Sequence, residues 1–176
     1  MIAIVTVDDR MGMMFNHRRV SRDKVVLQKI LSTVGMSPSQ VLWMNTYSNK
    51  LFETYLKEQC VKAEGENHGN KAEKTGTDAV IKKPASMIQI SDTFLAEASE
   101  GEYCFVEDLA LSPYKDKIEA LLVFCWNRAY PSDQKLDLDL SSVEWELTEI
   151  LDFPGNSHDT ITQKTYTKIR EKIQEK

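Results

Sequence analysis

MIQISDTFLAEASEGEYCFVEDLALSPYKDKIEALLVFCW, residues 87–126, shows the architecture of the chain more clearly than any other segment. It holds three short apolar runs, at 87–90, 103–106 and 120–126, which predict buried strands because they are too short for helices. Asp92 to Glu100 predicts a short helix that stops at Gly101. Pro113 interrupts the next connection, so at most a short helical piece is expected there. Strands that alternate with helices predict a mostly parallel sheet.

The N-terminal side continues this alternation. Ile2 to Val7 is an apolar, β-branched run that predicts a central strand. Apolar side chains then recur at helical spacing over 25–34, and Ser21 and Gly35 are predicted to cap and to end this helix. A second buried strand is expected at 41–44, and a second amphipathic helix is expected around 51–56.

The remaining segments predict a polar loop and a terminal hairpin. Residues 62–78 contain almost no large apolar side chain and predict a mobile loop, followed by a short strand candidate at 79–82. Residues 145–150 and 161–168 flank a turn-rich stretch and predict an antiparallel hairpin. The predicted fold class is therefore α/β: a three-layer α/β/α domain over residues 1–170, with a mostly parallel central sheet, a C-terminal antiparallel hairpin and a tail at 171–176.

Composition excludes several classes of function. A chain of 176 residues fits one domain, and its net charge of -5 gives no global attraction to nucleic acid. No apolar run approaches the roughly 20 residues of a membrane helix, so we expect a cytoplasmic protein with no membrane partner. The three histidines and three cysteines are scattered along the chain, which predicts no metal site and argues against a zinc hydrolase or ribonuclease.

The order of these elements and several local strings resemble the dihydrofolate reductase family. IVTVD at 4–8, followed by Gly12, is similar to the family's first strand and the start of its mobile loop. Asp23 falls within one residue of the position where the family keeps its single catalytic carboxylate, and WNRAYPSD ends in Asp133, where the family has a Gly-Asp before its terminal hairpin. The resemblance fails across 51–86, but it implies a dihydrofolate reductase-like fold.

The resemblance also implies a set of site residues. Asp23 takes the catalytic position, as a proton-relay or substrate-orienting acid. The implied substrate contacts are Thr6, Leu27 and Phe124, and the implied cofactor contacts are Gly12, Ser48 and Asp108. The cofactor of the family is NADPH.

The departures from the family pattern argue against that cofactor. Glu107 and Asp108 replace a Gly-Gly pair, and they bring negative charge towards the place of a phosphate. The family's Gly-Arg-x-Thr turn becomes NTYS at 45–48, which keeps the hydroxyl of Ser48 and loses the arginine. The Pro-Trp pair of the mobile loop becomes basic at 17–19, and Phe124 replaces a threonine. NADP binding is therefore disfavoured, and the cofactor stays unknown.

Each candidate residue also has a structural interpretation. Asp23 near the start of a helix interacts favourably with the helix dipole whether or not it is catalytic, and this interpretation is the stronger one. A cluster of arginines could bind an anion, although such a cluster is more often a solvated surface that pairs with acids such as Asp8 and Asp9; the cluster is Arg18, Arg19 and Arg22.

The same choice applies to the acidic pair, the histidine and the tryptophans. Glu107 and Asp108 could form a carboxylate pair for acid/base or metal chemistry, but Asp108 as a cap of the following segment is favoured. His158 could be a general base, but the sequence identifies no nucleophile beside it. The tryptophans are more simply explained by burial than by stacking on a ligand; they are Trp43, Trp126 and Trp145.

Three functional hypotheses follow. The first is a dihydrofolate reductase-like protein that does not reduce dihydrofolate and binds a small planar or anionic molecule in a pocket between Asp23 and Phe124. The second is an NADPH-dependent reductase of a pteridine or pyrimidine-like substrate. The third is a non-catalytic protein-interaction or regulatory domain, in which the loop at 62–78 contacts a protein partner. The sequence does not decide whether the chain is an enzyme.

Overall fold

The structure is a computed structural model that describes residues 1–65 and 85–169. Its elements are β1 (Ile2–Val7), β2 (Gly12–Phe15), β3 (Arg18–Arg19), α1 (Lys24–Met36), β4 (Leu42–Met44), α2 (Thr46–Gly65), β5 (Ile88–Ile90), α4 (Phe94–Glu97), β6 (Tyr103–Val106), the 3₁₀ helix η2 (Ser112–Lys117), β7 (Ala120–Cys125), β8 (Gln134–Lys135), β9 (Trp145–Phe153) and β10 (Ile161–Lys168).

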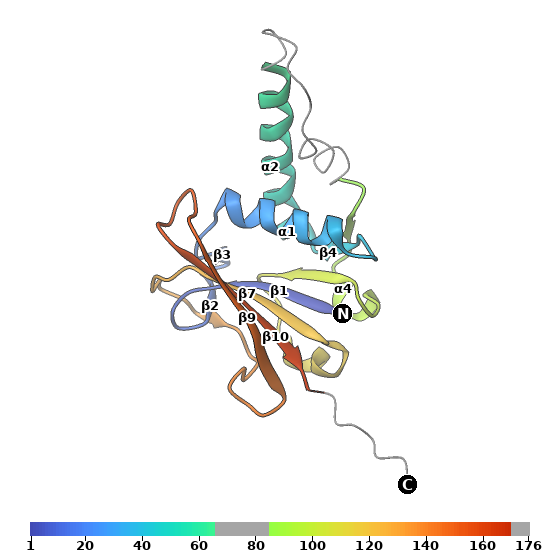
Figure 1. Cartoon of the computed structure of the whole chain (residues 1–176), viewed down its shortest axis with the longest axis vertical. Helices are drawn as coiled ribbons and strands as arrows, with labels where there is room; N and C mark the ends of the chain where they lie inside the picture. The colour runs from blue at the N-terminus through green and yellow to red at the C-terminus, as the bar shows by residue number, and fades with distance from the viewer. Residues whose placement is uncertain (66–84, 170–176) are drawn as a thin grey trace.

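The central sheet has the order β5-β4-β6-β1-β7-β10-β9 (Figure 1). β1 pairs in parallel with β6 on one side and with β7 on the other, and β4 pairs in parallel with both β5 and β6. β10 runs antiparallel to β7 and to β9, so the last two strands form the terminal hairpin. The predicted α/β architecture, a mostly parallel sheet with an antiparallel edge, is confirmed.

Two apolar layers cover the two faces of this sheet. Successive side chains of β1 point to opposite faces, so Val5 packs with α4 and the segment around η2, while Ile4 packs with α1 and α2. Ile30 of α1 and Phe52 of α2 belong to the second layer, and Phe94 of α4 belongs to the first. The result is the three-layer arrangement that the sequence predicts.

The start of α1 differs from the prediction. The N-cap is Asp23, whose Oδ1 accepts a hydrogen bond from the backbone N–H of Val25 at 2.8 Å, and Ser21 lies before the helix. Gly35 lies inside the last turn, and the helix ends at Met36. Serine and aspartate are both good N-caps, so residue type alone does not choose between them.

The helix α2 is longer than its apolar pattern indicates. It starts at Thr46, because the side-chain oxygen of Asn45 accepts a hydrogen bond from the N–H of Ser48 at 3.0 Å and caps the first turn. It continues to Gly65, so the predicted loop at 62–78 begins too early. The rest of that loop, and the strand candidate at 79–82, lie outside the described residues.

A second, three-stranded sheet has the order β3-β2-β8, and the sequence did not predict it. Asn16 and His17 form the turn between β2 and β3, and both have positive φ, 52° and 60°. Two successive residues with positive φ match the type of tight turn that joins short antiparallel strands. This turn brings Arg18 and Arg19 back beside the main sheet.

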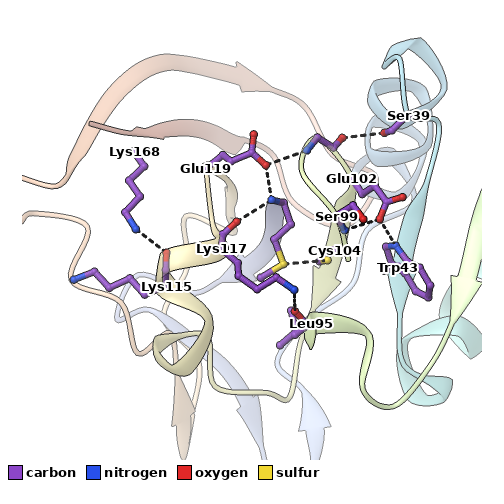
Figure 2. A network of polar contacts seen from close by, with 12 residues as sticks. Ser39, Trp43, Leu95, Ser99, Glu102, Cys104, Lys115, Lys117, Glu119 and Lys168 are labelled. Carbon is purple, nitrogen blue, oxygen red and sulfur yellow. Dashed lines mark hydrogen bonds and ion pairs between the residues drawn. The ribbon is translucent and has the colours of Figure 1, made fainter. Parts of the chain in front are cut away.

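Polar contacts link the residues that precede the central strands at their amino ends (Figure 2). The amine of Met1 donates to the carbonyl oxygen of Lys117 at 2.8 Å and forms an ion pair with Glu119. Glu119 also accepts from the N–H of Gly101 at 3.0 Å, and the Cys104 thiol faces the sulfur of Met1 at 3.6 Å. These contacts join β1, β6 and β7 at the edge opposite to the candidate site.

Candidate functional site at the carboxyl edge of the sheet

The four central parallel strands end at the same edge, and each is followed by a polar or aromatic residue. Asp8 follows β1, Asn45 follows β4, Glu107 follows β6 and Trp126 follows β7. All four side chains are buried. In open α/β sheets, ligands bind in the crevice outside the carboxyl ends of the strands, so this edge is the place to look for a site.

Glu107 is the centre of a buried polar cluster at this edge. Its Oε1 lies 2.9 Å from Nε of Arg19, and its Oε2 accepts hydrogen bonds from Nη2 of Arg19 at 3.1 Å and from the hydroxyl of Ser48 at 2.8 Å. Burial raises the pKa of Glu107, while the charge of Arg19 and the hydrogen bonds act against that rise. Arg19 therefore pairs with Glu107, not with Asp8 or Asp9, the acids considered in the sequence analysis.

The predicted cofactor contacts Ser48 and Asp108 are bound to their neighbours. Ser48 donates its hydroxyl hydrogen to Glu107, and Asp108 accepts a hydrogen bond from the side-chain nitrogen of Asn45 at 2.8 Å. A phosphate at this point would meet two carboxylates and would compete with Glu107 for its donors. The residues present do not fit the phosphates of a nicotinamide dinucleotide.

Gly12, the third predicted cofactor contact, packs against the protein itself. Its N–H donates to the buried carboxylate of Asp8 at 2.6 Å. A Cβ on Gly12 would lie 2.3 Å from Oγ of Ser132, so only glycine fits this close approach. Asp8 also accepts from the N–H groups of Arg10 and Tyr130, and it thereby fixes the loops around β2.

Asp23, the predicted catalytic acid, is buried and surrounded by hydrogen-bond donors. Besides the N–H of Val25, it accepts the N–H of Ser157 at 2.7 Å and the hydroxyl of Ser157 at 2.8 Å. Burial by itself would raise the pKa of Asp23, but these hydrogen bonds outweigh it and hold the pKa below its usual value. Gly155 closes the space on one side, since a Cβ there would lie 2.5 Å from Oδ2. The carboxylate therefore caps α1 and holds the turn between β9 and β10.

The predicted substrate contacts lie in the sheet and in the core. Thr6 and Phe124 are partners in the register of β1 and β7, and both are buried. Leu27 and Phe124 belong to the apolar layer under α1, where the ring of Phe124 packs edge-on against Phe153 with centroids 6.3 Å apart. These three residues are not among those that line the two clefts described below, and their role as ligand contacts stays a prediction.

A histidine from the terminal hairpin lies beside Asp23. Nε2 of His158 is 2.8 Å from the hydroxyl of Tyr130 and 3.3 Å from the hydroxyl of Ser21. Its Nδ1 is 3.0 Å from the hydroxyl of Ser157 and 3.8 Å from Oδ2 of Asp23. This grouping was not predicted, because its members come from three separate parts of the chain and no local motif joins them.

A basic cleft of about 900 Å³ opens between β3, the start of α1 and the start of α2. Its lining residues include Ser21, Tyr47 and four cations: Arg18, Arg19, Arg22 and Lys50. A second cleft of about 600 Å³, with Tyr130 in its lining, shares Arg18 and Arg19 with the first. The arginine cluster of the sequence analysis thus lines a cleft, and Lys50 and Tyr47 of α2 are additions that the sequence did not indicate.

Three of the four cations are available to a ligand. Arg18, Arg22 and Lys50 are exposed, and no carboxylate within residues 1–61 and 85–169, whose side chains the structure describes, forms a salt bridge with any of them. Arg19 is neutralised by Glu107, and its guanidinium lies over the ring of Tyr47 at 4.7 Å from the centroid. The cleft therefore combines unneutralised positive charge with an aromatic surface.

Comparison with solved structures defines the fold. A dihydrofolate reductase from Enterococcus faecalis, solved in complex with NADP(H) and RAB-propyl, superposes with a TM-score of 0.53 over 96% of this chain and 96% of that chain, at 12% sequence identity. The chain therefore has a dihydrofolate reductase-like fold, as its sequence predicts. No protein-family model and no curated protein sequence matches it.

Neither a metal centre nor a membrane span is found in the part of the chain that the structure describes. No three His, Cys, Asp or Glu side chains gather there as a metal site needs. No helix there is long and apolar enough to cross a membrane.

Proposed function

We propose that this chain binds a small, planar, anionic molecule in the basic cleft and does not act as a dihydrofolate reductase. The observation that carries the proposal is the group of three cations without carboxylate partners in the described residues: Arg18, Arg22 and Lys50. Like charges around one cleft repel one another. The binding of an anion is therefore favoured both by its attraction to the cations and by the loss of the repulsion between them. Negative groups elsewhere on an acidic chain do not cancel this local field, because salt screens them beyond about 10 Å.

The preference for a planar ligand comes from the aromatic wall of the cleft. Tyr47 is partly exposed and lines the cleft together with Leu51. Aromatic rings pack favourably against other flat π-systems, and the arginine guanidiniums add flat cationic faces. A ring system that carries a phosphate or carboxylate group matches both features.

Dihydrofolate reduction needs a nicotinamide cofactor, and the residues of this chain do not favour one. The reductase that shares the fold was solved with NADP(H), but here Glu107 already uses the hydroxyl of Ser48 and the guanidinium of Arg19. Binding a dinucleotide phosphate at this point would require breaking a buried ion pair. An NADPH-dependent reductase is the alternative function, and the titration described next tests it as well.

A thermal-shift titration tests the proposal. The probes are flavin mononucleotide, riboflavin as the same ring without phosphate, inorganic pyrophosphate and NADPH. A ligand at 100 times its dissociation constant stabilises the folded state by about 2.7 kcal/mol, which raises the melting temperature by several degrees. We expect a larger shift with flavin mononucleotide than with riboflavin. Stabilisation by NADPH beyond that by flavin mononucleotide would favour the reductase instead.

Matched variants locate the binding site. Arg22→Gln and Lys50→Gln each remove one cation of the cleft, and they should reduce the shift with flavin mononucleotide. Lys57→Gln is the control, because Lys57 lies on the same helix, is largely exposed and is not among the lining residues of either cleft. Equal loss in all three variants would show that only overall charge matters and would refute the cleft.

A further inference from the structure

The hydrogen bonds around Asp23 fix the direction of each proton in the histidine cluster. Asp23 has a lowered pKa and is ionised, so its carboxylate only accepts. The hydroxyl of Ser157 has two acceptors in reach, Oδ2 of Asp23 and the carbonyl oxygen of Arg22, both at 2.8 Å. With either acceptor, the single hydroxyl hydrogen of Ser157 points away from His158. The hydroxyl oxygen of Ser157 therefore accepts a hydrogen bond from Nδ1 of the imidazole.

The neutral His158 therefore carries its hydrogen on Nδ1 and presents the lone pair of Nε2 on the other side. Two hydroxyls face that lone pair, Tyr130 at 2.8 Å and Ser21 at 3.3 Å. This is the tautomer that a general base needs, with a carboxylate behind it and a hydroxyl in front.

The imidazole is also held in place. It stacks on the indole of Trp126, with ring centroids 4.9 Å apart and an angle of 21° between the planes, and its side chain is only 6% exposed. Ser21 is partly buried and is among the residues that line the basic cleft. A rigid base thus lies within 3.3 Å of the hydroxyl of a residue that lines the cleft.

We propose that Ser21 and His158 form a nucleophile and general-base pair, positioned by Asp23 and Ser157, which hydrolyses esters that carry an anionic group. The class of substrate rests on the proposed function, because the anionic group would be held by Arg22 and its neighbours in the same cleft. The assignment of the nucleophile and the base depends on other contacts than those of the anionic group. The Ser21–His158 pair and the anion-binding cleft can therefore be refuted separately.

The reaction balances with water as the second substrate. Oγ of Ser21 attacks the ester carbonyl carbon while its proton passes to Nε2 of His158. The bond from carbon to the alcohol oxygen breaks, and the leaving alcohol takes the proton from Nε2. Water then attacks the acyl group on Ser21 and gives its proton to the same nitrogen. The acid leaves, Oγ recovers its proton, and nothing is oxidised or reduced.

Tyr130 has a defined effect in this arrangement. Nε2 has one lone pair, and the Tyr130 hydroxyl is nearer to it than the Ser21 hydroxyl. Tyr130 must therefore turn aside before Ser21 can be deprotonated. Removing its hydroxyl should free the base for Ser21.

Covalent labelling of the full chain with a fluorophosphonate tests the pair without relying on the anionic cleft. We expect one adduct, located on Ser21 by peptide mass spectrometry, in the wild type, and the same adduct at a higher rate in Tyr130→Phe. Ser21→Ala should remove the adduct, and His158→Gln should slow labelling by roughly 100-fold or more. Ser99→Ala is the matched control, since Ser99 is an exposed serine at the amino end of β6. No adduct, or an adduct on Ser157, overturns the proposal.

A second variant guards against misfolding of His158→Gln. In Ser21→Cys, the new thiol should react with iodoacetamide at least ten times faster than the exposed thiol of Cys60, because the base activates it. Equal rates would overturn the activation by His158.

Ester hydrolysis then separates this proposal from the proposed function. p-Nitrophenyl hemisuccinate should be cleaved at least ten times faster than p-nitrophenyl acetate, and Arg22→Gln should remove that preference. Labelling of Ser21 without a preference would keep the nucleophile and refute the anionic cleft. Stabilisation by flavin mononucleotide without labelling would keep the cleft and refute the nucleophile.

Discussion

The backbone N–H of Ser157 donates a 2.7 Å hydrogen bond to the carboxylate of Asp23, and this bond ties the turn between β9 and β10 to the first residue before α1. The partners are 134 positions apart in the sequence. The carboxylate to which the resemblance assigns a catalytic role therefore also links two distant segments of the fold. Replacing Asp23 should lower the stability of the protein whether or not the residue is catalytic.

Asp23→Asn should destabilise the protein. The amide keeps one oxygen for the N–H of Val25, but its nitrogen would face the donors of Ser157. Losing charged hydrogen bonds at a buried N-cap costs about 1–3 kcal/mol, measured as the free energy of unfolding in urea. Asp159→Asn is the control, because Asp159 is an exposed aspartate of the same turn region. Equal stability of the two variants would contradict the capping role.

The pH dependence of stability should report the same carboxylate. The pKa of Asp23 is lower in the folded state than the roughly 3.9 of an unfolded aspartate, so its contribution is present above pH ~4 and is lost as the pH falls through the folded value. In Asp23→Asn this part of the acid sensitivity disappears. The difference in unfolding free energy between wild type and variant should shrink below pH ~4, and a difference that stays constant would refute the assignment.

Arg19 and Glu107 should be strongly coupled. Arg19→Gln leaves a buried carboxylate with the Ser48 hydroxyl as its one remaining side-chain donor among the described residues, and should cost roughly 3 kcal/mol. Glu107→Gln should cost less, because the Arg19 side chain is 18% exposed and its charge reaches water. In a double-mutant cycle, the combined loss should fall short of the sum by more than about 1 kcal/mol. Additive losses would mean that the ion pair contributes nothing.

The thiols should differ in reactivity. Cys60 is exposed, whereas burial raises the pKa of Cys104 to about 12. Ellman's reagent should therefore modify Cys60 rapidly in the native protein and Cys104 only after unfolding. Fast native reaction of Cys104 would show that the packing of β6 against Met1 is looser than described.

The central sheet could be predicted because each of its strands has a local signal. β1 is an apolar, β-branched run, β7 is an apolar run, and the two strands of the terminal hairpin flank a turn-rich stretch. The second sheet has no such signal. β3 and β8 have two residues each. β3 forms because the turn after Phe15 brings it back to β2, and β8 forms because it pairs with β2 from a distant part of the chain.

The candidate site was predictable only in part. The arginine cluster stood out as a local charge pattern, and Asp23 stood out through the resemblance. Tyr47 and Lys50 precede the helix that the sequence predicts around 51–56, and their place in the cleft depends on how the longer helix α2 packs beside β3. His158 is a candidate base in the sequence alone, but its contact with Ser21 depends on the hairpin turn lying against the start of α1, which no local pattern indicates.

Isothermal titration calorimetry with flavin mononucleotide and riboflavin tests the central claim most directly. Binding of flavin mononucleotide should be at least tenfold tighter than that of riboflavin, should weaken as salt rises from about 0.05 to 0.5 M, and should lose this advantage in Arg22→Gln/Lys50→Gln. Equal affinity for the two flavins in the wild type, or an advantage that survives in the double variant, would contradict an anion-binding cleft at the carboxyl edge of this sheet.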